Sequence, residues 1–476
     1  MRIGHLTRKA ATLGVGRGTV VLAQFAINLV LVRWWMPEEF GRFHQIRLLL
    51  TLAALLDLGL PIGLLQASGG MTPHQRDDLF RRGISFSLVL GILAGVGFVC
   101  AALILPDQAI AHALPAAGLL IAATIPAAAL ESVLVVQERH LRASIIGAAA
   151  ALGGLAASSL VLFRHPTVDA VYLCLALAGV SRLVALWKWS GVPWQVLCAW
   201  PSAIWPLLRT SFAASANRLL AMLSASVDRA VVALLFSAGT LGWYVTGAWE
   251  VPFMSVFFGA IVSTILPEMS EHWAAGRTQD FLAVWHAAIR RTAWIVFPLW
   301  LWVWVWAPEL LQLLFTSRFE DGLPVFRVYL LVLPLRVAVY SVLFLAMNET
   351  RLLLWGAALD LTLNVCLSVA LAALIGPIGP AVATTTATWV QTLYYLIVLA
   401  RPLKTPVSRL LPWGALCRAL AAASVAVLPT IAVRSWVQGD ALRLLVALIA
   451  TVGVLGVFMI RRASGTSSGR SRETDL

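Results

Sequence analysis

Long apolar segments follow one another along the whole chain, separated by short polar stretches. A helix of about 20 apolar residues is long enough to cross the hydrocarbon core of a bilayer. The apolar runs are continuous, whereas the strands of a membrane β-barrel would alternate apolar and polar residues. The pattern predicts an all-α polytopic membrane protein with about 14 transmembrane helices. These are expected at residues 13–35, 42–67, 83–105, 115–137, 143–163, 168–187, 205–236, 240–266, 287–315, 323–347, 352–374, 379–400, 413–433 and 441–460.

The composition agrees with this pattern. Hydrophobic residues make up 60% of the 476 residues and charged residues 12%, whereas a soluble domain carries about 25% charged residues. The formal net charge of +13 does not indicate nucleic-acid binding, because most basic residues lie between apolar runs. There they set orientation and meet lipid headgroups.

The loop charges predict the orientation. With the N-terminus in the cytoplasm, most arginines and lysines fall in cytoplasmic segments such as 68–82, 188–204 and 267–286. The opposite loops 106–114, 237–239 and 375–378 contain none. This asymmetry follows the positive-inside rule, so we expect both termini in the cytoplasm.

Sequence signals for enzymatic chemistry are missing. No Gly-x-x-x-x-Gly-Lys-Ser/Thr phosphate loop is present, and the five cysteines lack metal-ligand spacing. The eight histidines lie mostly in loops or at span ends, where we expect them to be solvated. The loops are too short for a catalytic domain. We therefore expect no catalytic domain, no cofactor and no metal.

A faint internal repeat divides the chain. The stretch Glu39-Phe40-Gly41-Arg42-Phe43 is echoed 201 residues later by Thr240-Leu241-Gly242-Trp243-Tyr244. Because six spans are an even number, the two halves would run in parallel. We expect six-helix bundles at residues 1–200 and 201–404, two additional helices at 405–460 and a disordered basic tail at 461–476.

Several charged residues fall inside the predicted spans, where each costs about 2.5–3.5 kcal/mol. In a helical hairpin, residues equally far from the turn lie at equal depth. This places Arg17 level with Asp57, and Asn364 level with Gln391. It also places Asp228 and Arg229 level with Glu250. Such contacts would either fix helix packing or gate movement, and depth alone does not decide between these roles.

Other arginines have no acid at matching depth. Arg47, Arg218 and Arg336 would therefore line a wet cavity, where a guanidinium suits phosphate oxygens. This predicts an anionic substrate. Neutral polar residues expected beside them are Gln24, Asn28 and Asn217. By contrast, Glu131 and Arg182 lie near span ends and are expected to reach out to the headgroups.

Prolines inside the spans are expected to act as kinks or hinges. They are Pro61, Pro252, Pro298 and Pro334. The first follows Gly59 closely, so a bend in the second span is expected just after Asp57.

Ordered motifs then suggest a family. The early motifs are Pro37, Glu39-Phe40-Gly41 and Asp57-Leu58-Gly59-Leu60. The later motifs are Ser226-Val227-Asp228-Arg229, Pro267-Glu268-Met269-Ser270 and Gly376-Pro377-Ile378-Gly379-Pro380. Together they resemble the Wzx-type polysaccharide flippases of the MOP exporter superfamily.

The resemblance implies two six-helix bundles around a central cavity in a bacterial inner membrane. It implies flipping of a polyprenyl-pyrophosphate-linked oligosaccharide, such as an O-antigen, capsule or exopolysaccharide unit, to the periplasmic leaflet. Arg17 and Arg47 would contact the pyrophosphate. A glycan polymerase or glycosyltransferases would be the protein partners.

Three alternatives stay open. A lipid II flippase and a multidrug cation antiporter share this fold, although a drug antiporter would need an acidic cavity. A non-transporting partner of a glycan synthase is the alternative from another functional class.

Overall fold

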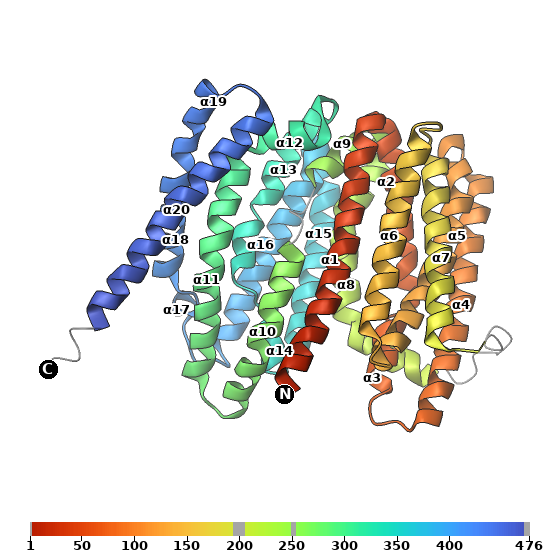
Figure 1. Cartoon of the computed structure of the whole chain (residues 1–476), viewed down its shortest axis with the longest axis horizontal. Coiled ribbons are helices and arrows are strands. Elements are labelled where there is room, and N and C mark those ends of the chain that lie inside the picture. The colour runs from red at the N-terminus through yellow and green to blue at the C-terminus, as the bar shows by residue number, and fades with distance from the viewer. Residues whose placement is uncertain (1, 194–204, 249–253, 471–476) are drawn as a thin grey trace. The chain divides into compact units, whose positions relative to one another are not determined.

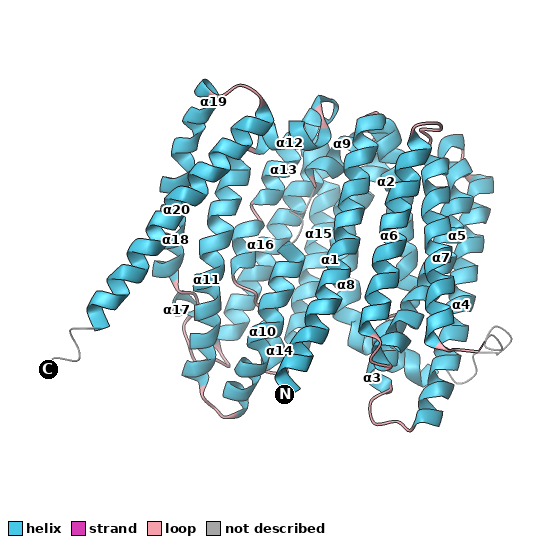
Figure 2. Ribbon diagram, in the orientation of Figure 1, coloured by secondary structure: helices cyan, strands magenta, loops and turns pink. Residues whose placement is uncertain are grey.

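The structure is a computed structural model that describes residues 2–193, 205–248 and 254–470. Within these ranges every regular element is a helix (Figure 2). The helices of the first half are α1 (Arg2–Trp34), α2 (Pro37–Ala54), α3 (Leu60–Ala67), α4 (Pro73–Ile104), α5 (Gln108–Val136), α6 (His140–Leu162), α7 (Val168–Ser190) and α8 (Trp205–Leu235).

The second half continues in the same way (Figure 1). Its helices are α9 (Ala238–Gly247), α10 (Met254–Ala274), α11 (Thr278–Val305), α12 (Ala307–Phe315), α13 (Leu323–Leu330), α14 (Ser341–Ala346), α15 (Thr350–Ile375), α16 (Gly379–Ala400), α17 (Val407–Leu410), α18 (Trp413–Val427), α19 (Val433–Trp436) and α20 (Asp440–Arg470).

Each predicted span coincides with one helix or with a short series of helices, which confirms the all-helical membrane fold. Seven of the described helical segments are long and apolar enough to cross a membrane. The number rises to nine if two bent pairs are each one span. The count stays below fourteen partly because several predicted spans are broken, and a broken helix is too short to be scored alone.

Contacts divide the chain into two compact units. Unit 1 contains residues 1–245, 250–256 and 364–380, and unit 2 contains 246–249, 257–363 and 381–476. These units do not test the predicted division at residues 200 and 404, which rests on the internal repeat and stays a prediction.

The second predicted span is bent where the sequence indicated. Helix α2 ends at Ala54, and a 3₁₀ turn, η1 (Leu55–Asp57), follows it. Leu58 and Gly59 then take left-handed φ angles of 49° and 74°. Pro61 occupies the first turn of α3, where its missing N–H costs no hydrogen bond. This confirms the predicted bend at Gly59 and Pro61.

Of the other prolines, Pro334 lies in a 3₁₀ break, η4 (Leu333–Val337), as expected. Pro298 lies inside the continuous α11, and the 76° bend comes after Val305 instead. Pro252 lies outside the described residues.

Two small-residue contacts join the repeat copies inside unit 1. At the start of α2, a Cβ on Gly41 would overlap the carbonyl oxygen of Ala238, the first residue of α9. Reciprocally, a Cβ on Gly242 would overlap the carbonyl oxygen of Pro37, the first residue of α2. The same offset of 201 residues relates Pro37 to Ala238 and Gly41 to Gly242. The echo in the sequence is therefore a pair of equivalent glycines that face each other's helix start.

The second contact lies beyond the bend. Gly59 and Gly63 of α3 face Ser215 and Ser211 of α8, and a Cβ on either glycine would overlap the facing serine side chain. Ser215 Oγ donates to the Gly59 carbonyl at 3.4 Å. Small residues four apart on both helices allow the backbones to approach closely, as in membrane helix pairs. The bent span α2–α3 thus touches the second repeat at both of its ends.

In unit 2, an ion pair anchors the C-terminal helices. Arg434 in α19 donates to both carboxylate oxygens of Glu309 in α12, at 2.6 and 3.0 Å. It also donates to the Val305 carbonyl at 2.6 Å, and its guanidinium lies 5.0 Å from the Trp306 ring centroid. These contacts sit at the bend after α11, where α11 has ended and its last carbonyl needs a donor.

Candidate functional site

A polar cluster lies inside unit 1, where α1, α2 and α8 contribute side chains. On α1, the Asn28 amide donates to the Gln24 carbonyl one turn earlier, at 2.9 Å. The side-chain oxygen of Asn28 faces Arg47 of α2, whose Nη1 lies 3.4 Å away. No carboxylate among the described residues pairs with Arg47. Arg47 is thus held by a neutral amide and keeps its full charge.

Two further nitrogen-bearing side chains lie near Arg47. Arg229 of α8 and His44, one turn before Arg47 on α2, lie close enough to both Arg47 and each other for electrostatic repulsion. His44 is only 8% exposed, and its Nε2 has no hydrogen-bond partner among the described residues. Two guanidinium groups close together repel each other, and an anion between them would offset that repulsion.

The acid next to Arg229 is engaged with another helix. Asp228 is 1% exposed and accepts a hydrogen bond of 3.0 Å from the Tyr244 hydroxyl of α9. A buried carboxylate requires such partners. The Asp228–Tyr244 contact therefore ties α8 to α9 next to the Gly242 contact described above.

The structure does not test most of the contacts that were predicted from equal depth in helical hairpins. Asp57 accepts from the Gly59 N–H at 2.8 Å, so this carboxylate stabilises the bend itself. Its predicted partner Arg17 has a side chain outside the described residues, and so do Asn217 and Arg218. Glu250 lies outside them as well, so its contact with Asp228 and Arg229 stays a prediction.

Asn364 and Gln391 each hydrogen-bond to another residue, and their predicted contact stays a prediction. Asn364 is fully buried and donates to the Ser224 carbonyl at 3.0 Å, whereas Gln391 donates to the Gly356 carbonyl at 3.0 Å. Equal depth does not make two residues face each other, because helix rotation decides which face each one presents.

Arg336 belongs to unit 2, where it is half-buried in the η4 break. Breaks of this kind leave backbone groups without helical partners, and at membrane depth they are tolerated next to a cavity or to protein. The structure thus brings Arg47 together with Arg229 and Asn28, and places Arg336 in a different unit. Gln24 contributes only its backbone carbonyl, which accepts from Asn28.

Two expectations about charged and titratable residues need correction. His44 is not solvated at a span end but buried. Glu131 of α5 and Arg182 of α7 do not reach separately toward headgroups but form an ion pair between their helices. Pairing offsets part of the cost of placing each charge in the membrane.

His44 and Tyr244 are the cluster residues that sequence reasoning missed. A signal for His44 existed, because it precedes Arg47 by three residues and so shares its helix face. Tyr244 gave no such signal, since a tyrosine at the end of a short echo motif is equally typical of a membrane interface.

The chemistry of the cluster is that of an anion site. It offers two guanidinium groups, one imidazole and one amide, and no group of three or more metal-ligating side chains is present in the described ranges. Guanidinium groups bind phosphate oxygens through two parallel N–H bonds.

Comparison with known families gives a match over more than half of the chain. The family model described as "Lipid II flippase MurJ" matches residues 173–447. No curated protein sequence matches the chain.

Solved structures with the same fold include three transporters. A lipid II flippase MurJ in an inward closed conformation is 14% identical, covers 98% of this chain and 99% of its own, and gives a TM-score of 0.70. An inward-facing MATE-family multidrug transporter is 15% identical, with coverage of 81% and 94% and a TM-score of 0.63. A MOP superfamily transporter from Pyrococcus furiosus is 14% identical, with coverage of 84% and 95% and a TM-score of 0.58.

Proposed function

This chain belongs to the lipid II flippase MurJ family, a family of membrane transporters and not of enzymes, and we propose that it flips lipid II across the bacterial cytoplasmic membrane. The proposed direction is from the cytoplasmic to the periplasmic leaflet, with both chain termini in the cytoplasm. The observation that carries the proposal is the cluster of Arg47, Arg229 and His44 inside unit 1.

The cluster suits the polar part of such a substrate. A pyrophosphate carries oxygens with negative charge, and each guanidinium can bind two of them. The uncharged Asn28 orients Arg47 at 3.4 Å without neutralising it. Binding an anion here would relieve the repulsion between the two guanidinium groups, and this gives substrate affinity a physical source.

The helix contacts suggest how movement is coupled to binding. The bent span α2–α3 meets the second repeat at Gly41 and Gly242 on one side of the cluster and at Gly63 and Ser211 on the other. Alternating access requires that one contact opens while the other stays closed. The left-handed turn at Leu58 and Gly59 is the point where the span can bend between them.

Other substrates fit less well. The Wzx-type substrate, a polyprenyl-pyrophosphate-linked oligosaccharide, shares the pyrophosphate, but the family match favours lipid II. A cationic drug would be repelled by the arginines. A glycan polymerase or a glycosyltransferase would be expected as a protein partner only if the chain had the Wzx-type function, and this partnership stays a proposal.

The test is lipid flipping in liposomes that contain the purified full chain. We expect fluorescent lipid II to change leaflets faster than the Wzx-type lipid-linked oligosaccharide. Arg47→Gln should slow lipid II flipping about tenfold or more, because a charge-assisted hydrogen bond is worth about 1.5–3 kcal/mol. Arg351→Gln, at an exposed position at the start of α15, is the matched control and should flip normally.

Two outcomes would count against this proposal. Faster flipping of the oligosaccharide lipid would favour the Wzx-type function. Absence of flipping of either lipid, combined with loss of glycan export in cells, would favour a non-transporting partner of a glycan synthase.

A further inference from the structure

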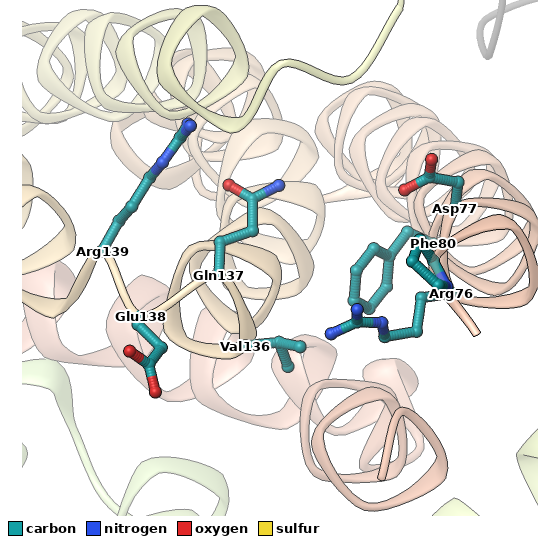
Figure 3. A pocket seen from close by; sticks show the side chains of 8 residues that line it. Arg76, Asp77, Phe80, Val136, Gln137, Glu138 and Arg139 are labelled. Atoms are coloured by element: carbon teal, nitrogen blue, oxygen red, sulfur yellow. The ribbon is translucent and has the colours of Figure 1, made fainter. Parts of the chain in front are cut away.

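A second site lies at one end of unit 1, away from the arginine cluster. A pocket of about 370 Å³ opens between the first turns of α4 and the turn that joins α5 to α6 (Figure 3). The α4 wall includes Arg76, Asp77 and Phe80, and the other wall includes Val136 and Gln137. By the loop charges, this end of the unit is expected to face the cytoplasm.

Arg76 supplies an unused positive charge to the pocket. Its side chain is half-buried and extends across the pocket toward Val136 (Figure 3). Its Nε is buried and has no hydrogen-bond partner in the described part of the chain. The nearby Asp78 does not neutralise it, because Asp78 pairs with Arg82 at 2.7 Å. A buried guanidinium nitrogen without an acceptor in the protein is available to an anion or to water.

The opposite wall is held rigidly. Gln137 donates to the Ser190 carbonyl at 2.9 Å and Arg139 to the Trp189 carbonyl at 2.7 Å, which fixes the turn to the end of α7. Between them, Glu138 takes a left-handed φ of 60°. A non-glycine residue pays a strain cost in this conformation, and such strain is found where a site is pre-organised.

The two walls also differ in polarity. Pro73, the first residue of α4, lines the pocket, so the positive end of that helix dipole faces it. Val136, the last residue of α5, lines the other wall, so the negative end of the α5 dipole faces it too. With Arg76 and the exposed Asp77, the pocket offers separate places for a phosphate and for an ammonium group.

The lipid bilayer is the nearest source of such a molecule. Helix α4 is a candidate membrane span, and Ile92, Leu93 and Val96 on it are 59%, 62% and 53% exposed. Acyl chains would pack against these side chains while the headgroup stays at the helix end.

We propose that this pocket binds the headgroup of a zwitterionic aminophospholipid. Its phosphate is held by the Arg76 guanidinium, near the N-terminal end of α4. Its ammonium group lies near Asp77 and the C-terminal end of α5. The bound lipid braces α4 against the α5–α6 turn, and this role is independent of the substrate at the arginine cluster.

The experiment is native mass spectrometry of the full chain in detergent, with phosphatidylethanolamine, phosphatidylcholine and phosphatidylglycerol added separately. We expect one phosphatidylethanolamine to be retained in preference to the other two. Arg76→Gln should weaken its binding about tenfold, from the loss of a charge-assisted contact. Asp77→Asn should abolish the preference over phosphatidylglycerol.

Arg81→Gln is the matched control, because Arg81 is exposed on the same helix and does not line the pocket. Its lipid binding should equal that of the unmodified chain. If Arg76→Gln reduces folded yield, Arg76→Lys keeps the charge without the planar fork and should bind with intermediate strength.

The proposal is overturned if Arg76→Gln binds phosphatidylethanolamine as tightly as the unmodified chain, or if Arg81→Gln weakens it equally. Displacement of the lipid by excess inorganic phosphate would also overturn it, because the pocket would then bind free phosphate. Equal retention of all three lipids would contradict the role of Asp77.

Discussion

At the scale of single residues, the carboxylates in unit 1 accept hydrogen bonds from neighbouring groups, whereas Arg47 does not pair with a carboxylate of the described residues. Asp228 is bound to Tyr244, and Asp57 is bound to its own bend. Within the described ranges, the Arg47 side chain hydrogen-bonds to the Asn28 amide and pairs with no carboxylate. An anionic substrate would therefore meet arginine charge that the protein's own acids have not neutralised.

Removal of the Tyr244 hydroxyl tests whether its hydrogen bond to Asp228 stabilises this cluster. Tyr244→Phe leaves the buried Asp228 carboxylate with one hydrogen bond fewer, which costs about 1–3 kcal/mol. We expect a lower melting temperature in detergent. Tyr394→Phe is the control, because the Tyr394 hydroxyl lies 3.5 Å from its acceptor, the Leu352 carbonyl, at the limit of hydrogen bonding. Equal melting temperatures for the two variants would contradict the assigned role of Tyr244.

At the scale of helices, close approach of backbones decides which elements meet. Residues 41 and 242 must be glycine because a Cβ at either position would overlap a backbone carbonyl oxygen of the facing helix. Their backbone conformation does not itself require glycine. A backbone atom cannot rotate away as a side chain can. The contact therefore tolerates only glycine at these two positions.

This argument predicts the effect of added methyl groups. Gly41→Ala and Gly242→Ala should each lower stability by about 1–3 kcal/mol, the usual cost of overpacking, and should slow flipping because this contact cannot close. The measurements are thermal unfolding in detergent and flipping in liposomes. Gly97→Ala on α4, where a Cβ meets nothing within 4 Å, should leave both unchanged. A destabilised Gly97→Ala protein would point to a general intolerance of substitution.

The contact between α3 and α8 allows a compensation test. In Gly63→Ala the new methyl overlaps the Ser211 side chain, so we expect loss of stability and of flipping. Adding Ser211→Gly removes the overlapping atoms and should restore both. Failure of the double variant to recover, with a protein that still folds, would show that the two residues do not act through this contact.

The anchor of the C-terminal helices is a further helix-scale feature. Arg434→Gln would leave Glu309, whose side chain is 11% exposed, without its cation. Removing one partner of a buried ion pair lowers the free energy of unfolding by about 3–5 kcal/mol. Because the Arg434 side chain is 37% exposed, we expect a loss at the lower end of this range. Arg443→Gln loses a 3.4 Å pair with Asp440 and a 2.7 Å hydrogen bond to the Val437 carbonyl. It should cost less, because Asp440 is 29% exposed and keeps its contact with water. Similar melting temperatures for these variants would contradict the anchoring role.

At the scale of the whole molecule, the order of the spans and their orientation can be tested directly. In a chain without its five cysteines, His74→Cys should react with a membrane-impermeant maleimide only from the cytoplasmic side. Gln108→Cys, at the other end of α4, should react only from the opposite side. Both positions are exposed. Labelling of both from one side would contradict the assignment of α4 as a span.

The sequence by itself determined the all-helical membrane class, the positions of the spans and the bend at Gly59 and Pro61. Each of these depends on local properties, namely the length of an apolar run or the conformation of two or three residues. The orientation prediction has the same local basis in loop charge.

Only the tertiary structure decided which residues face each other. Equal distance from the turn placed Asn364 level with Gln391, yet in the structure each hydrogen-bonds to another residue. Packing between helices also brought Arg229 of α8 to Arg47 of α2 and paired Glu131 with Arg182. Rotation about a helix axis is set by packing against neighbours distant in the sequence, and the equivalence of Gly41 and Gly242 became meaningful only when their helices were seen in contact.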